Sequence, residues 1–380
     1  MIKFKLINTL VFLCFFLQVK AQEIYFPPAG EWQEISASEY NLNFSEAVDF
    51  AKSNEYSESR DLRQAILKGF QHEPYHEISG PTKRRGEPAG IILKNGYMVA
   101  TWGDIKRVDM TFSVTKSFLS TTALIARDKN LITSFDEPVR NYVWDDTFEG
   151  AHNSKITWKH LLQQNSDWSG QLWGGFDWAD RPSRDQNIDE WRSRELHEPG
   201  TFYKYNDVRV NVLAYSLLNV FRNPLPKVLK ENIMDPIEAS QTWRWYGYDN
   251  SWTTIDGLKM QSVSGGGHSG GGMFINTEDM ARFGLLFMNN GRWKGKELIS
   301  EDLIEKSIQS STTNPNYGYM WWLNAAGDRN MPEIDPEIFY AAGFGGNFIV
   351  VDQKNNMVIV TRWLEPSKFE EFLNLIYKNI

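Results

Sequence analysis

The chain has 380 residues, of which 41% are hydrophobic and 23% are charged. This composition is typical of a globular protein with one large core or two cooperating lobes, and it excludes wholesale disorder, a collagen-like chain and a polytopic membrane protein. The 40 basic and 48 acidic residues give a net charge of −8 without a large basic cluster, so we expect no nucleic-acid partner. Aromatic residues make up 14% of the chain, and such rings often wall a binding cleft.

Residues 1–21 have the pattern of a cleavable export signal. Two lysines precede an apolar run over residues 10–17, and small residues place the cleavage near Ala21. The apolar run is too short for a membrane span, which needs about 20 residues. The only cysteine, Cys14, lies within this run. We therefore expect a secreted or periplasmic mature chain, 22–380, without disulfides or a membrane span.

The pattern of apolar residues predicts several helices and a hairpin near each end of the chain. Helical spacing covers residues 45–70, 113–127, 208–220 and 369–376. Hairpins are predicted at 90–100, around an Asn-Gly step, and at 347–361. We therefore expect an α+β fold in which both termini form one antiparallel sheet flanked by helices, with a mainly helical inserted lobe. The α/β lobe would span about 22–110 and 255–380, and the helical lobe about 111–254.

Ser113 and Lys116 stand three residues apart at the start of a predicted helix, so their side chains share one face about one turn apart. A serine hydroxyl is a weak nucleophile and needs a base within hydrogen-bond reach. Burial of Lys116 would lower its pKa from about 10.4 toward neutrality and let it act as that base. The positive end of the helix would stabilise negative charge that forms near Ser113. The same spacing can also arise by chance, because both residue types are common.

A second element lies about ninety residues downstream. It consists of a Pro-Gly-Thr run at 199–201 and a Tyr-Asn-Asp run at 205–207, and it leads into a predicted helix. A tyrosine whose hydroxyl meets both Ser113 and Lys116 could share its proton with them. A phenolate beside a lysine ammonium is favoured by Coulomb attraction in a dry site. Tyr205 is therefore a candidate for proton transfer.

Three motifs together resemble the serine beta-lactamase-like superfamily, which includes class C beta-lactamases, DD-peptidases and related esterases and amidases such as 6-aminohexanoate-dimer hydrolase. Ser113 and Lys116 match its Ser-x-x-Lys box, and Tyr205 begins a Tyr-x-Asn box that has Asp207 in place of Asn. The glycines at 271–272 resemble its Gly-Gly stretch before a helix. The resemblance covers most of the chain. It implies a beta-lactamase/transpeptidase-like fold, an acylated serine at Ser113, and Lys116 and Tyr205 as the proton-transfer pair.

The third box of the family, Lys-Thr-Gly or His-Thr-Gly, is missing from this chain. A neutral Ala-Ala-Gly-Phe run at 341–344 stands just before the second hairpin. The resemblance implies an oxyanion hole formed by the backbone N–H groups of Ser113 and Phe344, each worth about 3–4 kcal/mol of transition-state stabilisation. Ala342 and Gly343 would let a substrate lie against the strand. Because no side chain there can engage a substrate carboxylate, ester or amide hydrolysis is favoured over antibiotic hydrolysis.

Four further side chains are candidate substrate contacts. Asp207 could stabilise protonated Lys116 or a substrate ammonium, or it could cap the following helix. His268 could line the cleft or serve as a hydrogen-bonded structural residue. Trp168 and Trp173 could form a wall that prefers apolar or cationic groups, or they could belong to the core.

A competing nucleophile motif is rejected on physical grounds. The Gly-x-Ser-x-Gly pattern at 267–271 matches the nucleophile elbow of another hydrolase fold. That elbow needs a buried strand before it, and residues 261–266 are too polar and rich in glycine. It also needs a later histidine, and His268 is the last one in the chain. The glycines are instead expected to let the backbone pass close to the substrate or to the nucleophile helix.

The sequence predicts no metal site and no organic cofactor. His72 and His76 are four residues apart, but Pro74 between them prevents a helix that would place both on one face. The predicted function is thus an exported serine hydrolase that cleaves a small-molecule ester or amide. Two alternatives remain: a beta-lactamase or penicillin-binding DD-peptidase, and a non-catalytic binding protein with the same fold. The oligomeric state is left open.

Overall fold

The computed structural model describes residues 24–325, 331–378 and 380. The predicted export signal over 1–21 lies outside the described residues. Among the helices that the structure describes, none is both long enough and apolar enough to cross a membrane.

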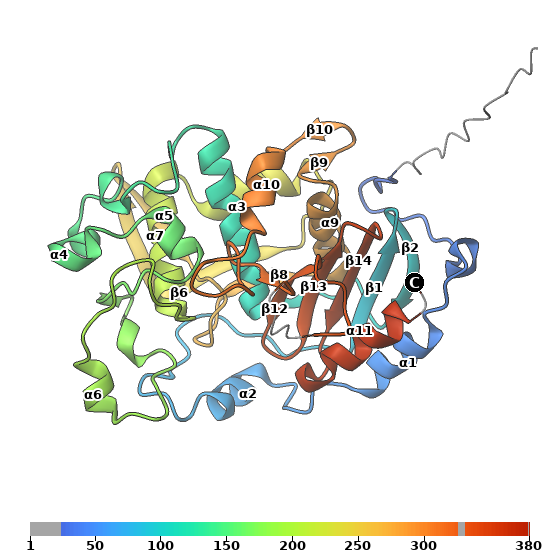
Figure 1. The fold of residues 1–380 in the computed structure, drawn as a ribbon, viewed down its shortest axis with the longest axis horizontal. Helices are drawn as coiled ribbons and strands as arrows, with labels where there is room; N and C mark the ends of the chain where they lie inside the picture. The colour runs from blue at the N-terminus through green and yellow to red at the C-terminus, as the bar shows by residue number, and fades with distance from the viewer. Residues whose placement is uncertain (1–23, 326–330, 379) are drawn as a thin grey trace, which may run out of the picture.

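Strands from both ends of the chain form one six-stranded sheet, as the sequence predicts (Figure 1). In spatial order the strands are β11 (Trp322–Leu323), β12 (Phe339–Gly343), β13 (Asn347–Asp352), β14 (Met357–Arg362), β1 (Ala89–Lys94) and β2 (Tyr97–Trp102). The two hairpins are joined by the antiparallel pairing of β1 with β14, in which Ile91 lies opposite Val360. All neighbouring strands in the sheet are antiparallel. The predicted α+β fold with a sheet built from both termini is therefore confirmed.

Helices cover both faces of this sheet, which explains why its central strands are apolar on both sides. On β1, Ile91 points into the cluster that contains α9 (Thr277–Met288), and Ile92 points into the cluster that contains α11 (Phe369–Tyr377). Figure 1 shows α11 beside α1 (Ser45–Ser53) on one side of the sheet. Successive residues of a strand face opposite ways, so both clusters draw on the same strands.

The single helical stretch predicted over 45–70 is two helices, α1 and α2 (Leu62–Gly69). Between them the chain is polar, and the Asp61 side chain accepts a hydrogen bond from the Arg63 N–H at the start of α2. An aspartate at this position ends the preceding segment and starts a new helix, because it satisfies a backbone donor that the helix itself leaves unpaired.

The structure contains a second, four-stranded sheet that the sequence did not predict. Its order is β3 (Asp109–Met110), β8 (Gly272–Ile275), β6 (Arg244–Ile255) and β7 (Leu258–Val263). The long strand β6 falls within the region predicted to be the helical lobe. Its aromatic residues are mixed in their burial: Trp245 is buried, whereas Tyr246 and Trp252 are exposed. This mixture hides the regular alternation by which a half-buried strand is usually recognised.

Two long buried helices dominate the helical lobe, α3 (Thr115–Asp128) and α7 (Asp207–Phe221), which pack against each other. Each begins with polar residues that are nevertheless buried, Lys116 on α3 and Asp207 on α7. The remaining elements are α4 (Gly150–Asn153), α5 (Trp158–Leu162), α6 (Ile188–Arg192), α8 (Leu225–Leu229), α10 (Glu301–Ser307), β4 (Gln171–Leu172), β5 (Gly175–Phe176), β9 (Arg292–Trp293), β10 (Lys296–Glu297) and short turns of 3-10 or π-helix.

Gly284 of α9 faces strands β13 and β14 of the large sheet at close range, and it offers a test of the packing. A Cβ atom there would lie 2.5 Å from Val358 Cγ1 and 2.9 Å from Ile349 Cγ2. These branched side chains are stiff, so we expect Gly284→Ala to lower the free energy of unfolding by about 1–2 kcal/mol despite the better helix propensity of alanine. Urea and thermal unfolding measure the change.

Gly69→Ala is the matched control for helix propensity, because a Cβ at Gly69 would meet its nearest neighbour, a ring atom of Phe344, at an ordinary 3.5 Å. This control should unfold no more easily than the parent protein. A Gly284→Ala protein at least as stable as the parent would contradict the close contact between α9 and the sheet.

Candidate active site

Ser113 lies in a sharp turn between a short strand and a long helix. The 3-10 turn η2 (Phe112–Val114) connects β3 to α3, and Phe112 has a left-handed φ of 50°. This conformation is uncommon for a bulky residue and is held here because Phe112 is buried. Ser113 is only partly buried, whereas both its neighbours in the turn are buried. The turn therefore leaves the serine accessible to solvent, while the residues on either side of it are buried.

The glycine-rich segment passes close to this turn, as predicted. A Cβ on Gly266 would lie 2.0 Å from the carbonyl oxygen of Phe112, and Gly266 itself has a φ of 77°. Only glycine tolerates both conditions. The neighbouring Gly265 is fixed by Asn211 of α7, whose Oδ1 accepts a hydrogen bond of 2.9 Å from the Gly265 N–H.

Lys116 reaches back one turn and binds the serine. Its Nζ donates to Ser113 Oγ at 2.8 Å and to the Gly265 carbonyl at 3.3 Å. The lysine is only 1% exposed. The structure thus brings the two residues together as the helical spacing predicts, with the ammonium group held inside the protein rather than in water.

The pKa of Lys116 moves in the opposite direction to that predicted from burial. Burial alone would lower the pKa of Lys116, but the neighbouring Asp207 carboxylate and Tyr205 together raise it above its usual range. Lys116 Nζ lies 2.8 Å from Asp207 Oδ1. Lys116 is therefore an ammonium ion at neutral pH, and it donates to Ser113 instead of accepting its proton.

Asp207 is a partner of cations and not the cap of α7. The N-cap is Asn206, whose side chain accepts from the Arg209 N–H at 3.0 Å. Burial would raise the pKa of Asp207, but the positive charges of Arg181 and Lys116 hold it well below its usual range. Of the roles considered from the sequence, the structure thus favours stabilisation of protonated Lys116.

Tyr205 presents its ring to the same cluster. The ring centroid lies 5.0 Å from Lys116 Nζ and 5.1 Å from Arg181 Cζ. Trp322 of β11 stacks on the ring at 5.9 Å between centroids, and Tyr317 meets it edge-on at 6.3 Å. Within the part of the chain that the structure describes, Ser113 Oγ receives a hydrogen bond from Lys116 and none from Tyr205. Tyr205 thus lies beside the Ser113–Lys116 pair, and its part in proton transfer stays a prediction.

The end of β12 lies directly against the nucleophile turn. Gly343 pairs with Asn347 of β13, and a Cβ on Gly343 would lie 2.0 Å from the Thr111 carbonyl oxygen and 3.3 Å from the Ser113 nitrogen. The next residue, Phe344, packs its ring 5.0 Å from that of Phe112. The backbones of Gly343 and Ser113 are thus neighbours, and the role of the Ser113 and Phe344 N–H groups as an oxyanion hole stays a prediction. Ala342 is partly exposed on the same strand.

A network of charges next to Asp207 was missed in the sequence. Arg181 Nη1 donates to Asp207 Oδ2 at 2.8 Å and to Asp180 Oδ1 at 2.9 Å. His268, predicted to line the cleft, is 6% exposed and lies with Nδ1 3.4 Å from Asp207 Oδ2 and Nε2 3.3 Å from Glu73 Oε2. Burial would lower the pKa of His268, but Asp207 and Asp180 raise it. The abundance of acidic residues around Arg181 was the only signal in the sequence.

Three potential metal ligands meet within this network. One ligand atom each from Glu73, Asp180 and His268 lies within 4.8 Å of the others. Arg181 Nη1 already contacts both oxygens of Asp180, at 2.9 and 3.0 Å. A guanidinium at this distance repels a second cation, so the arrangement favours an ion-pair network over a metal site.

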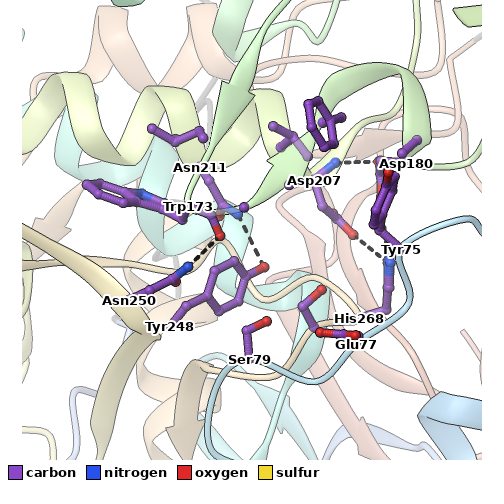
Figure 2. A pocket seen from close by; sticks show the side chains of 17 residues that line it. Tyr75, Glu77, Ser79, Trp173, Asp180, Asp207, Asn211, Tyr248, Asn250 and His268 are labelled. Carbon is purple, nitrogen blue, oxygen red and sulfur yellow. Dashed lines mark hydrogen bonds and ion pairs between the residues drawn. The ribbon is translucent and has the colours of Figure 1, made fainter.

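A cavity of about 180 Å³ adjoins the network (Figure 2). Asp207 and His268 line it. Beside it, the side-chain amide of Asn211 donates a hydrogen bond of 3.2 Å to the Tyr248 hydroxyl (Figure 2). Trp173 lines this cavity, but Ser113 is not among the lining residues, so the role of Trp173 as a substrate-facing wall stays a prediction. Trp168 does not line the cavity: it is 2% exposed, and its indole N–H donates to the Thr147 carbonyl at 2.7 Å. Trp168 therefore belongs to the core, because its polar atom finds its partner inside the protein.

Replacing Asp207 tests the charge network. In Asp207→Asn, Lys116 and Arg181 lose their shared counter-ion, and an unpaired buried cation costs about 3 kcal/mol or more, so the free energy of unfolding should fall by that amount at neutral pH. Since the folded-state pKa of Asp207 is lowered, this contribution is fully present above the unfolded-state value of about 3.9 and disappears as the pH falls through the folded-state value. Urea unfolding from pH 3 to 8 measures the difference.

Asp256→Asn provides the control, because Asp256 is paired with Arg222 at the surface, where solvent screens the charges. Its loss should change stability little at any pH. If Asp207→Asn were as stable as the parent protein across the range, Asp207 would not be the counter-ion of the buried cations.

Among curated proteins, the chain is similar to a putative D-alanyl-D-alanine carboxypeptidase from Escherichia coli O157:H7, with 24% identity over 198 residues. This alignment covers 43% of the chain and 45% of the relative, so the chain matches less than half of that protein's length. A second relative of the same description, from Salmonella agona (strain SL483), is 19% identical over 377 residues, with 77% of the chain and 83% of the relative covered.

Solved structures share the fold. A putative 6-aminohexanoate-dimer hydrolase from Bacillus anthracis superposes with a TM-score of 0.57 at 17% identity, covering 94% of this chain and 89% of that one. A putative beta-lactamase from Bacteroides dorei DSM 17855 gives 0.56 at 14% identity, with 83% and 98% covered. A family VIII carboxylesterase gives 0.55 at 15% identity, with 84% and 97% covered. At such low identity these similarities concern the fold alone.

The model of the family described as Beta-lactamase matches residues 108–362, more than half of the chain. The matched span contains Ser113, Lys116 and Tyr205, and it confirms the family resemblance found in the motifs. The chain belongs to the beta-lactamase family.

Proposed function

We propose that the protein is an exported serine hydrolase that cleaves small esters or amides through an acyl-serine intermediate. The observation that carries this proposal is the 2.8 Å hydrogen bond from a buried lysine to the oxygen of a partly exposed serine. Burying a lysine is costly unless its charge is paired, and Asp207 provides the partner here. Such an arrangement serves to keep a nucleophile oriented and its oxygen in a positive environment.

The proposed mechanism begins with attack of Ser113 Oγ on the carbonyl carbon of the substrate. Because Lys116 is protonated, the proton of Ser113 passes to the deprotonated oxygen of Tyr205. This step requires the Tyr205 oxygen to come within hydrogen-bond distance of Ser113 Oγ. The negative charge on the carbonyl oxygen is stabilised by the N–H groups of Ser113 and Phe344. Collapse of this intermediate breaks the bond to the leaving group, which takes the proton from Tyr205. Water then releases the acyl group by the same steps in reverse.

Esters and amides are the proposed substrates because the residues of β12 next to Ser113 have small, uncharged side chains. Ala342 and Gly343 offer space and backbone groups, and neither carries a charge that would bind a carboxylate. Two of the similar structures are described as a 6-aminohexanoate-dimer hydrolase and a carboxylesterase, which supports the same class. A panel of short esters, amino-acid amides and linear amide dimers, offered to the protein without residues 1–21, identifies the preferred bond.

The nucleophile is tested with a fluorophosphonate probe, which reacts with activated serines. The parent protein should be labelled, and Ser113→Ala should lose the label completely because the attacking oxygen is gone. The control is Ser269→Ala, which removes the serine of the Gly-x-Ser-x-Gly pattern and should be labelled like the parent. Absence of labelling in the folded parent protein would favour the non-catalytic binding protein. If only Ser269→Ala lost the label, the nucleophile would be Ser269 and not Ser113.

A penicillin-recognising enzyme is the second candidate, favoured by the carboxypeptidase description of the curated relatives. We expect a fluorescent penicillin to label the parent protein far more slowly than the fluorophosphonate does, because the neutral strand lacks a partner for the penicillin carboxylate. Gel fluorescence over time measures both rates, with Ser113→Ala as the blank. Rapid penicillin labelling followed by hydrolysis would establish the second candidate instead.

A further inference from the structure

Phe70, the residue that follows α2, contacts both sides of the site from a segment that precedes the span matched by the family model. We propose that Phe70 is a specificity-determining residue that closes the side of the site that holds the acyl group, so that the enzyme accepts short acyl chains. This inference rests on the proposed function and deepens it, because it states the length of the acyl group that the site takes.

The ring of Phe70 lies between the large sheet and the charge network around Asp207. Toward the sheet, its centroid is 5.7 Å from that of Phe344, the residue after β12. On the other side, it stacks on the imidazole of His268 at 4.2 Å, with 15° between the two planes. Arg181 Cζ, from the helical lobe, is 5.7 Å from the same centroid. One aromatic side chain thus joins the strand beside the nucleophile to the charged residues opposite it.

Two series of contacts connect this ring to the nucleophile. On the sheet side, the ring of Phe344 lies 5.0 Å from that of the residue before Ser113. On the helical side, Arg181 shares the carboxylate of Asp207 with Lys116, whose Nζ donates to the serine oxygen. Both series end at the nucleophile, and the phenyl ring joins them on the side of α2. The site is therefore bounded on that side by an apolar side chain.

The proposed mechanism determines which part of the substrate meets Phe70. The leaving group takes its proton from Tyr205, so it lies on the side of that tyrosine, whose ring stacks on Trp322 at 5.9 Å. In the same mechanism the carbonyl oxygen is bound by the N–H groups of Ser113 and Phe344. The acyl chain then extends away from the tyrosine, along Phe344 and toward the ring of Phe70.

The segment that carries Phe70 is anchored both before and after the ring. Before it, the buried residues of α2 belong to the hydrophobic cluster that contains Phe112. After it, the N–H groups of Ser79 and Gly80 both donate to the Ser269 carbonyl, at 2.8 and 3.0 Å. Because the ring is held from both directions, a long acyl chain meets it instead of displacing it.

Glu73 fixes the same segment to the charge network. Its Oε2 accepts a hydrogen bond of 3.2 Å from the Arg181 N–H and lies 3.3 Å from His268 Nε2. The imidazole on which Phe70 stacks is thus held by a carboxylate from the loop that follows the ring. Phe70 and Phe344 are themselves only partly buried, so each keeps apolar surface that a short acyl chain can cover.

The test is the dependence of hydrolysis on acyl length, measured with p-nitrophenyl esters from acetate to octanoate, which share one leaving group. In the parent protein, kcat/KM should be highest for the short esters and should fall about tenfold or more by octanoate. Phe70→Ala removes the ring, and its ratio of kcat/KM for octanoate to that for acetate should exceed the ratio of the parent by about tenfold or more, because each methylene group that newly fits an apolar pocket has an effect of this size.

Lys68→Ala is the matched control on the same helix. The Lys68 side chain is 67% exposed and pairs with Glu58 at 2.7 Å, so its truncation should leave the ratio unchanged. Phe70→Leu covers the case in which Phe70→Ala folds poorly, because leucine keeps part of the apolar packing. Its ratio should lie between those of the parent protein and Phe70→Ala. A general loss of structure would lower the rates for short and long esters alike and leave the ratio as it is.

Fluorophosphonate labelling separates failure of the inference from failure of the proposed function. A labelled parent protein that cleaves octanoate as fast as acetate would overturn the inference while Ser113 remains the nucleophile. The parental ratio in both Phe70→Ala and Phe70→Leu would do the same. A labelled parent that cleaves none of the esters would also overturn it, since a short acyl chain should fit. A parent that is neither labelled nor active on any ester would overturn the proposed function, and the inference with it.

Discussion

The carboxylate of Asp207, buried between two cations, is the interaction on which the site depends. Lys116 is 1% exposed, and an ammonium ion in that position would cost several kcal/mol without a counter-ion. Asp207 supplies one from the first turn of α7, and its second oxygen binds Arg181 from the preceding loop. Three segments that are distant in the chain are thereby joined at one carboxyl group. The same contact sets the charge of the lysine that holds the nucleophile.

That charge decides how the chemistry is divided among the residues. A neutral lysine would be a base, whereas a lysine paired with Asp207 is a donor that orients Ser113 Oγ and places positive charge beside it. In the proposed mechanism the proton of the serine then needs another acceptor, and this is the hydroxyl oxygen of Tyr205, whose ring lies 5.0 Å from Lys116 Nζ. The family motifs name the same three residues, but only the Asp207 contact, at a position where the family has Asn, indicates which of them holds the proton.

Much of this could be predicted from short-range patterns. The spacing of Ser113 and Lys116 on one helix is local, and the two terminal hairpins follow from alternation of apolar residues, so both were found. The sign of the pKa change at Lys116 was left open, because burial predicts a lowered pKa, whereas the contact with Asp207, one of the roles considered, requires two helices to pack. Arg181 was missed for a similar reason: it contacts Asp207 from 26 positions away and Glu73 from 108. Trp168 could not be assigned, since core and cleft tryptophans look alike in a sequence.

The two walls of the site differ in charge, and this difference bears on what the site can recognise. On the sheet side, Ala342 and Gly343 present small neutral groups next to the Ser113 turn. On the helical side, Lys116 and Arg181 are both engaged by Asp207. A substrate carbonyl that enters between them would meet small neutral groups on one side and, on the other, positive charge that is already paired with Asp207. Because neither side offers an unpaired cation for a carboxylate, the charge distribution supports a neutral ester or amide as the proposed substrate.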